Sequence, residues 1–286
     1  MRELLPDLLK AAWRDVEAGR ITAEEFERRR VQWLGEYGRR WSAALLLDGR
    51  PDLKTSLLAE IGDYLPCDDP SEVERRCRGA VGTLATEWNQ QVAAGERTSV
   101  EGYYDRSESY LYDLMWWHSL VDDDGPLAYV TALDFATGRA CHDFLDFGAG
   151  VGAGGILFAR SGFQVTLADI SSTLLRFSGR RFESRRLSAQ FIDLKTAALP
   201  SASFDIVTAM DVFEHLADPV GAIDDIARAL KPGGYLYGRF HADIDAERPQ
   251  HIVSDFAPTF GRLREHGFVE VWRDEWLWGH QVFQRP

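Results

Sequence analysis

The sequence of 286 residues is poor in cysteine, in lysine and in long apolar runs, and the shortages limit what the protein can be. Its three cysteines lack CxxC spacing, so neither a disulfide framework nor a cysteine zinc site is indicated. No apolar run approaches the roughly 20 residues that span a membrane, and the N-terminal segment is too charged for a signal peptide. We therefore predict a cytoplasmic protein. Lysine supplies only four of the 32 basic residues, and this arginine bias suggests a GC-rich bacterial genome.

Basic charge is also in deficit. Lys and Arg number 32 and Asp and Glu 45, which gives a formal net charge of −13. A nucleic-acid duplex or an anionic bilayer would repel such a surface, so we expect no nucleic acid and no membrane as partner. One local basic run is interpreted as a solvated helix face; it consists of Arg176, Arg180, Arg181, Arg185 and Arg186.

Residues 1–140 have the pattern of helices. Apolar residues recur at helical spacing, and Thr22 with Glu25 forms a capping box before a helix that carries Phe26 and Trp33 along one side. Such stripes are most simply the packing faces of a helical bundle. We predict an all-helical N-terminal domain or lid over residues 1–140.

From residue 141 onward, strands and helices alternate. Strands are expected at 142–147, 163–169, 188–194, 204–212 and 235–241, and two more close the chain. KPGG at 231–234 is expected to end a helix before the fifth strand. The last two strands have no helix between them, which predicts an antiparallel pair. Alternating units of this kind imply a doubly wound α/β fold, a mostly parallel sheet with helices on both faces, over residues 141–286.

A glycine-rich turn, GAGVGAGG at 148–155, follows the first expected strand. Gly148, Gly150 and Gly152 let the backbone approach a ligand in conformations that a side chain would block. The turn lies at the strand ends, where such sheets bind their ligands. Asp169 closes the second strand, 21 residues after Gly148, and its carboxylate can accept hydrogen bonds from both hydroxyls of a ribose. Together they indicate a nucleoside-containing cofactor.

The glycines alone do not decide which nucleoside it is. The stretch 150–155 satisfies GxGxxG, the dinucleotide fingerprint, and keeps an NAD(P)-dependent oxidoreductase open. Asp146, however, lies two residues before the turn, where it could hold an amino-acid ammonium group. Asp193 and Leu194 end the third strand, where they could meet the edge and face of an adenine. The oxidoreductase also lacks a Tyr-x-x-x-Lys pair in the C-terminal half.

Five motifs in order carry a more specific resemblance. They are DFGAGVG (146–152), LADIS (167–171), IDL (192–194), FDIVTAMDVFEHL (204–216) and LKPGGYL (230–236). In this order and spacing the sequence resembles the class I S-adenosylmethionine-dependent methyltransferases, within them the small-molecule group that includes the ubiquinone-biosynthesis methyltransferases. The resemblance implies a seven-stranded sheet with an antiparallel last strand, a Rossmann-like methyltransferase fold, and S-adenosylmethionine as cofactor.

The resemblance also implies roles for individual residues on the donor side. Asp146 would hold the methionine ammonium directly or through water, Asp169 would bind the ribose hydroxyls, and Asp211 would close the methionine end of the pocket. The turn backbone would line the methionine and ribose, and three residues would surround adenine. The turn residues are Gly148, Ala149, Gly150 and Gly152, and the adenine residues are Ile170, Asp193 and Leu194.

Histidines at strand ends are the candidates for acting on the acceptor, because the histidine pKa lies near working pH. His215, His241 and His251 all fall on the expected active side. Each is a candidate base, with packing or loop anchoring as the alternative reading. His241, His251 and Asp243 could also bind a divalent metal, but their spacing matches no recognised metal motif, so we predict no metal.

Aromatic residues precede the first strand, in the segment 101–125. If this segment is a helix, Tyr110, Leu114, Trp117 and Val121 share one face, with Tyr104 near its start. In the resembled families such a helix often covers the cofactor. Tyr104 would then face the cofactor, unless these aromatic residues are core residues between the two halves.

The interpretation is therefore a small-molecule methyltransferase, with a role in specialised-metabolite biosynthesis expected. The N-terminal helices would cover the acceptor pocket, support a homodimer, or both. An NAD(P)-dependent oxidoreductase and a non-catalytic cofactor-binding protein of the same fold are the alternatives.

Overall fold

The computed structural model describes residues 3–65, 67, 69–93, 96–241 and 247–286. Seven strands form one sheet in the order β3-β2-β1-β4-β5-β7-β6. They are β1 (Asp143–Phe147), β2 (Gln164–Asp169), β3 (Gln190–Asp193), β4 (Phe204–Ala209), β5 (Leu230–Gly238), β6 (Val269–Arg273) and β7 (Gln281–Gln284). β1 to β5 pair in parallel, and β7 pairs antiparallel with both β5 and β6. This confirms the doubly wound fold and its antiparallel last strand.

Helices cover both faces of the sheet. They are α9 (Ala153–Arg160), α10 (Ser172–Ser184), the short η2 (Phe213–His215), α11 (Pro219–Ala229) and α12 (Ala257–Glu265). Alternate residues of β1 point to opposite faces, so Phe144 joins the core under α9 and α10, whereas Leu145 joins the core under α11 and α12. Each face of the sheet is therefore closed by its own apolar layer.

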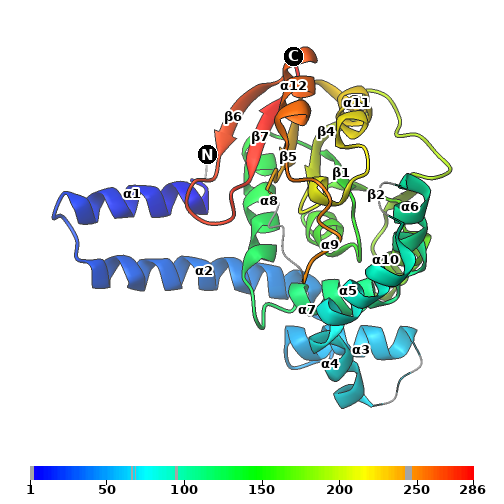
Figure 1. Cartoon of the computed structure of the whole chain (residues 1–286). Coiled ribbons are helices and arrows are strands. Elements are labelled where there is room, and N and C mark those ends of the chain that lie inside the picture. Colours follow the sequence, from blue (N-terminus) through cyan, green and yellow to red (C-terminus); the bar gives the residue numbers. More distant parts are fainter. Residues whose placement is uncertain (1–2, 66, 68, 94–95, 242–246) are drawn as a thin grey trace.

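The first half of the chain is helical throughout its described residues. It contains α1 (Leu5–Glu17), α2 (Ala23–Leu45), α3 (Leu53–Tyr64), α4 (Pro70–Arg78), α5 (Ala80–Gln91), α6 (Arg97–Arg106), α7 (Ser109–His118), the short η1 (Gly125–Leu127) and α8 (Ala128–Gly138). Thr22 caps α2 by accepting from the Glu25 amide at 3.1 Å, as the capping box predicts. The α1–α2 pair projects from the body, and α8 stands beside the sheet (Figure 1).

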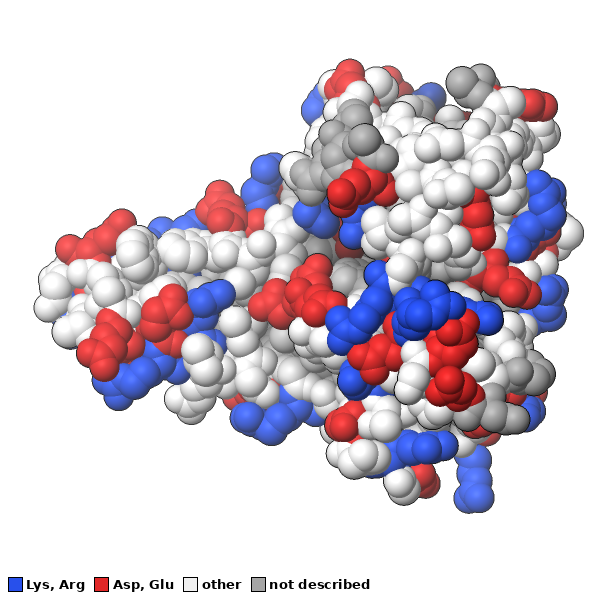
Figure 2. Space-filling view, turned by 60° about the horizontal axis from the view of Figure 1, so that its bottom comes forward, with Lys and Arg blue, Asp and Glu red and all other residues white. Residues whose placement is uncertain are grey.

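The two halves share one continuous core. The cluster that contains Phe144 and Phe158 of the sheet half also contains Trp41 of α2 and residues of α1 to α8. A boundary at residue 140 separates helical from mixed structure but crosses this shared core, so two independent domains remain a prediction. No helix among the described residues is long and apolar enough to cross a membrane. Acidic and basic side chains are interspersed on the face seen in Figure 2.

Two local predictions were wrong. The segment 101–125 is two helices, α6 and α7, separated at Ser107 and Glu108, and Val121 lies beyond α7 with an exposed side chain. β5 begins at Leu230 and runs through KPGG, because a bulge between its pairings with Phe204 and Ile206 accommodates the extra residues. α8 lies within the predicted helical half, although no individual helix had been placed at its position. Its residues 128–136 are all buried, so it has no polar face to give it an amphipathic pattern.

Candidate cofactor and acceptor site

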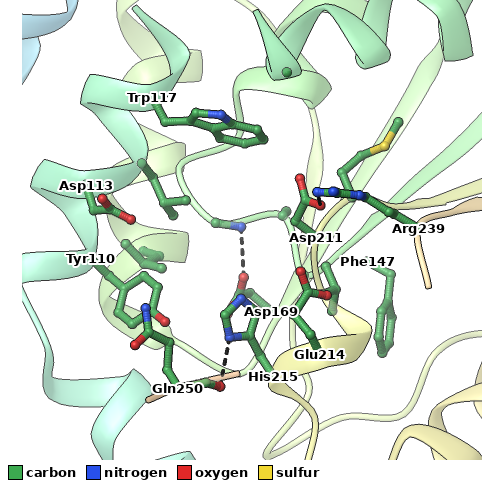
Figure 3. Close-up of a pocket in the computed structure, with 18 of the residues that line it drawn as sticks. Tyr110, Asp113, Trp117, Phe147, Asp169, Asp211, Glu214, His215, Arg239 and Gln250 are labelled. Carbon is green, nitrogen blue, oxygen red and sulfur yellow. Dashed lines mark hydrogen bonds and ion pairs between the residues drawn. The ribbon is translucent and has the colours of Figure 1, made fainter. Parts of the chain in front are cut away.

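A cavity of about 500 Å³ opens at the carboxyl ends of β1, β2 and β4, with α6 and α7 on its other side (Figure 3). Parallel sheets of this kind bind ligands where the strand order reverses, and here β1 lies between β2 and β4. Most of the predicted site residues line this cavity. They are Tyr104, Gly148, Ala149, Gly150, Asp169, Ile170, Leu194, Asp211, His215 and His251.

The glycine turn approaches its neighbours too closely for side chains. Gly148 has a φ of 71°, and a Cβ atom there would lie 2.6 Å from Val212. Gly150 has a φ of 52°, and its Cβ would lie 2.8 Å from Leu114 of α7. Gly152 also has a left-handed conformation and starts α9, but it does not line the cavity. The turn therefore presents main chain to the cavity.

Asp169 is held in place by two backbone amides. Its Oδ2 accepts from the Gly150 amide at 2.8 Å, and its Oδ1 accepts from the Ser171 amide at 2.7 Å. Burial raises the pKa of Asp169, while these amides lower it. A carboxylate oxygen can accept more than one hydrogen bond, so capacity remains for two ribose hydroxyls.

Asp146 does not line the cavity and is completely buried. Its Oδ1 accepts from Thr208 Oγ1 at 2.7 Å and from Tyr129 Oη at 3.3 Å. Burial raises the pKa of Asp146 to about 7, even though these two hydrogen bonds lower it. Direct contact between this carboxylate and a methionine ammonium is therefore not what the structure provides. Tyr129, which does line the cavity, lies next to it in the hydrogen-bond chain.

The expected adenine end is apolar. Ile170 and Leu194 line the cavity, whereas Asp193 does not. The Asp193 carboxylate pairs instead with Lys195 Nζ at 3.1 Å, and Lys195 in turn pairs with Asp105 of α6 at 3.0 Å. Asp105 also accepts from the Ser172 amide at 2.9 Å. This set of contacts attaches α6 to the ends of β2 and β3.

Asp211 follows β4 with a φ of 51°, a left-handed conformation that is uncommon for a residue with a side chain. Its Oδ1 is 2.8 Å from Nη1 of Arg239, which follows β5. Both residues line the cavity, and Figure 3 shows the pair side by side on its wall. Such backbone strain is often found at functional sites.

Glu214, His215 and His251 form a cluster on the acceptor side. Each offers one potential ligand atom, and these atoms lie within 4.8 Å of one another. The cluster forms because the amides of Ile252 and Val253 both donate to the Glu214 carbonyl, at 2.8 and 3.1 Å. Histidine and carboxylate ligands suit several divalent cations, so these three residues could hold a metal.

The protonation of this cluster follows from its burial. Burial, and next the charge of Asp211, raise the pKa of Glu214 to about 8. Burial, and next His251, lower the pKa of His215 to about 4. His215 Nδ1 lies 3.1 Å from the carbonyl oxygen of Gln250, which can only accept, so the ring proton is on Nδ1. The Nε2 atom then carries the lone pair, which can bind a metal or take a proton.

The helical half closes the cavity with aromatic side chains. Tyr104, Tyr110, Leu114 and Trp117 all line it. Tyr104 Oη lies 3.0 Å from His215 Nδ1, and Tyr110 Oη donates to Tyr104 Oη at 3.4 Å. These side chains are thus part of the cavity as well as of the core between the two halves.

His241 is exposed and does not line the cavity, so the structure does not bring it to the other two histidines. Asp243, its companion in the alternative metal site, lies outside the described residues.

Several cavity residues were not predicted from the sequence. Tyr129 belongs to α8, which had not been placed as an individual helix, and Arg239 follows a strand whose end had been placed at 241. His118 and His280 had been given no role, yet both line the cavity. Glu214 is the one that the sequence could have indicated, because it precedes His215 in a strand-end motif.

Comparisons with known proteins agree with this geometry. Residues 145–238 match a family model described as "Methyltransferase domain". The "Ubiquinone biosynthesis O-methyltransferase" of Xanthomonas oryzae pv. oryzae is 37% identical over 140 residues, which cover 43% of this chain and 54% of the relative. The enzyme of that name from Albidiferax ferrireducens is 37% identical over 100 residues, covering 32% and 38%. The chain thus spans about half the length of the first of these relatives and less than half the length of the second.

Similar solved structures include the N-methyltransferase NodS from Bradyrhizobium japonicum WM9. It has a TM-score of 0.44 and 21% identity, covering 58% of this chain and 99% of that one. Another is the PH0226 protein from Pyrococcus horikoshii OT3, with a TM-score of 0.47 and 17% identity, covering 63% and 93%.

The matched segment and the strand order define the class: the chain carries a class I S-adenosylmethionine-dependent methyltransferase domain. Within that class, the matched part resembles the ubiquinone-biosynthesis O-methyltransferases. Both predictions from the sequence are confirmed, and so is S-adenosylmethionine as the cofactor of the domain.

Proposed function

We propose that the chain transfers the methyl group of S-adenosylmethionine to a hydroxyl oxygen of a small molecule, in specialised-metabolite biosynthesis. The observation that carries the proposal is that one cavity contains both the donor residues, Asp169 and the glycine turn, and the acceptor cluster of Glu214, His215 and His251. An oxygen acceptor is supported by the similarity to O-methyltransferases.

On the donor side, each end of the cofactor meets a different kind of surface. Asp169 accepts from the ribose hydroxyls, Ile170 and Leu194 pack on adenine, and the turn backbone follows the chain from ribose to sulfur. Methyl transfer from a sulfonium is an in-line displacement, so these residues act mainly by positioning the donor.

On the acceptor side, the cluster would prepare the hydroxyl for attack. His215, neutral and with a lone pair on Nε2, can take the hydroxyl proton. If a divalent cation bound there instead, Glu214, His215 and His251 would hold it, and the cation would supply Lewis-acid chemistry that lowers the pKa of the acceptor hydroxyl. A chelator distinguishes the two, since only the second arrangement loses turnover in its presence.

The first experiment is calorimetric titration with S-adenosylhomocysteine, with NAD and NADP in parallel. We expect micromolar binding of S-adenosylhomocysteine alone. If NAD or NADP bound and S-adenosylhomocysteine did not, the methyltransferase proposal would be wrong and the alternative, an NAD(P)-dependent oxidoreductase, would take its place. Transfer of a labelled methyl group to a panel of hydroxylated aromatic compounds, with and without a chelator, then identifies acceptors; binding without any transfer would support the non-catalytic alternative.

Substitution of the cluster separates acceptor chemistry from cofactor binding. We expect His215→Ala and His251→Ala to leave the affinity for S-adenosylhomocysteine within about twofold and to lower turnover by about 100-fold, the scale of general-base catalysis. The exposed His241→Ala is the control. Unchanged turnover in both cluster variants would remove the histidines from the mechanism. The homodimer and the cytoplasmic location remain predictions, and light scattering of the purified chain tests the first.

A further inference from the structure

One part of the cavity wall is not used by the function proposed above. Tyr129 of α8 and His118 of α7 both line the cavity, and both rest against the ring of Trp41 from α2. Their ring centroids lie 5.8 Å and 5.6 Å from that of Trp41, and Trp41 is fully buried. The same indole therefore fixes the position of two polar side chains on the cavity wall.

The position of Tyr129 is set by Trp41, by Gly154 and by Asp146. One face stacks on Trp41 at an interplanar angle of 20°. The ring also occupies the space that a side chain at Gly154 would need, since a Cβ there would lie 2.1 Å from Tyr129 Cε1. The hydroxyl donates to Asp146 Oδ1 at 3.3 Å, which leaves the phenolic oxygen free to accept a hydrogen bond.

His118 is 4% exposed, and neither of its ring nitrogens has a hydrogen-bond partner among the described residues. A buried polar group without a partner costs free energy, so one that lines a cavity is suited to a ligand. Burial lowers the pKa of His118 to about 3, so the ring is neutral and has one donor and one acceptor nitrogen.

The local charges around these two side chains have opposite sign. Burial raises the pKa of Tyr129 most, and the carboxylates of Asp146, Asp211 and Asp169 raise it further. The charge that acts on His118 is the buried guanidinium of Arg181, which lowers its pKa. A ligand with a cationic and an anionic group side by side matches this wall, with its cation at Tyr129 and its anion at His118.

The direction of the cofactor leads to the same wall. Ribose is held at the end of β2, and the apolar residues for adenine lie at the ends of β2 and β3. The rest of the cofactor must therefore run the other way, over the end of β1 toward β4. Tyr129 lies at the end of β1, where it is hydrogen-bonded to Asp146.

We propose, on the basis of the proposed function, that Tyr129 and His118 bind the amino-acid half of S-adenosylmethionine. The Tyr129 hydroxyl, oriented by Asp146, accepts from the α-ammonium group, and the His118 ring donates to the α-carboxylate. The buried aspartate thus acts on the cofactor through the tyrosine, which α8 supplies.

Two ligands that differ only in this half of the molecule test the assignment. S-adenosylhomocysteine has the amino-acid group, whereas 5′-methylthioadenosine keeps the nucleoside and sulfur but lacks it. Tyr129→Phe and His118→Phe both keep an aromatic ring against Trp41. We expect each of them to lower the affinity for S-adenosylhomocysteine by about tenfold or more, which is the scale of a lost hydrogen bond to a charged group. Their affinity for 5′-methylthioadenosine should match the wild type in calorimetry.

The controls separate this contact from a general effect on the cavity. Tyr110→Phe removes a hydroxyl that bonds to Tyr104, and it should leave the ratio of the two affinities unchanged. His118→Asn restores an N–H donor and should recover part of the lost affinity. Equal weakening of both ligands, or none, in Tyr129→Phe and His118→Phe would overturn the inference. A wild-type chain that binds neither ligand would instead overturn the proposed function.

Discussion

Two regions face each other across the cavity: the glycine turn at 148–155, and the helical cover formed by α2, α6, α7 and α8. They differ in the kind of groups that they contribute. The turn from β1 to α9 contributes main chain, and its partner Asp169 is reached through backbone amides within the same sheet. The cover contributes side chains, and these come from several helices that precede β1, from α2 to α8. Trp41, Tyr104, His118 and Tyr129 belong to four different helices.

A buried ion pair is one of the places where the two regions meet. Arg181 of α10 is 1% exposed and donates from Nη1 to the Val151 carbonyl of the turn at 2.7 Å. Glu60 of α3 accepts from Arg181 Nε at 3.1 Å and from Arg185 Nη2 at 3.1 Å. These arginines had been interpreted as a solvated face; for Arg181 and Arg185 this was wrong, because their side chains are buried against Glu60 of α3. The helical half thus carries the counter-charge for a residue that holds the turn.

Removal of this counter-charge should have the largest effect. We expect Glu60→Gln to lower the free energy of unfolding by about 3–5 kcal/mol, because it leaves a buried guanidinium without its partner. The substitution should also lower the affinity for S-adenosylhomocysteine, because Arg181 holds the Val151 carbonyl of the glycine turn. Urea denaturation and calorimetry measure the two effects.

A second ion pair between the helices supplies the matched control. Asp134 of α8 pairs with Arg40 of α2 at 2.6 Å, and Asp134 is also buried, but neither residue bonds to the turn in any described contact. Asp134→Asn should lower stability and leave the cofactor affinity of the folded protein unchanged. Equal loss of affinity in both variants would show that the turn depends on general stability alone.

The close contact between Gly154 of α9 and Tyr129 of α8 predicts a smaller loss of stability. Gly154→Ala would place a methyl group within the ring of Tyr129, and overpacking of this kind costs about 1–3 kcal/mol. Thermal unfolding should show the loss. Gly82→Ala on α5, where nothing lies within 4 Å of the new atom, should instead stabilise the protein slightly. A neutral Gly154→Ala would mean that α8 moves away from the turn without cost.

A substitution of Asp169 tests how much the turn side of the cavity contributes to cofactor affinity. Asp169→Ala should make the binding free energy of S-adenosylhomocysteine less favourable by about 1–3 kcal/mol, because charged hydrogen bonds to ribose are lost. Asp193→Ala should weaken it less, since the Asp193 carboxylate pairs with Lys195 outside the cavity lining. Calorimetry at one salt concentration compares the two. A larger effect at Asp193 would restore it as the main adenine contact.

The smallest effect is a dependence on pH. The charges and hydrogen bonds of Arg181 and Arg185 outweigh the burial of Glu60 and hold its pKa below the ordinary value of 4.5. The unfolded state therefore binds a proton first as pH falls, so the stability that Glu60 contributes is complete above about pH 4.5 and is lost below it. The difference in unfolding free energy between wild type and Glu60→Gln should shrink between pH 6 and pH 3. A constant difference would exclude ionised Glu60 as its source.

Much of the fold and of the donor side could be predicted because their signals are local. Strand ends, the glycine turn and Asp169 lie within short stretches whose backbone conformation depends on their own residues. His215 and His251 were predicted singly, but their meeting with Glu214 depends on the loop that binds the Glu214 carbonyl. Asp146 ends β1 as expected, but its burial and its contact with Tyr129 had not been predicted, since Tyr129 gave no sequence signal.

By itself, the sequence determined the doubly wound sheet, the glycine turn and a site for a nucleoside-containing cofactor, because periodicity, glycine and strand-end carboxylates act over a few residues. Only the tertiary structure decided which side chains close the cavity. Tyr129 lies on a helix that is buried on all sides, and Glu60 meets Arg181 across 121 residues of sequence. Contacts of that kind depend on how the helices pack against the sheet, and packing brings together residues that no local pattern connects.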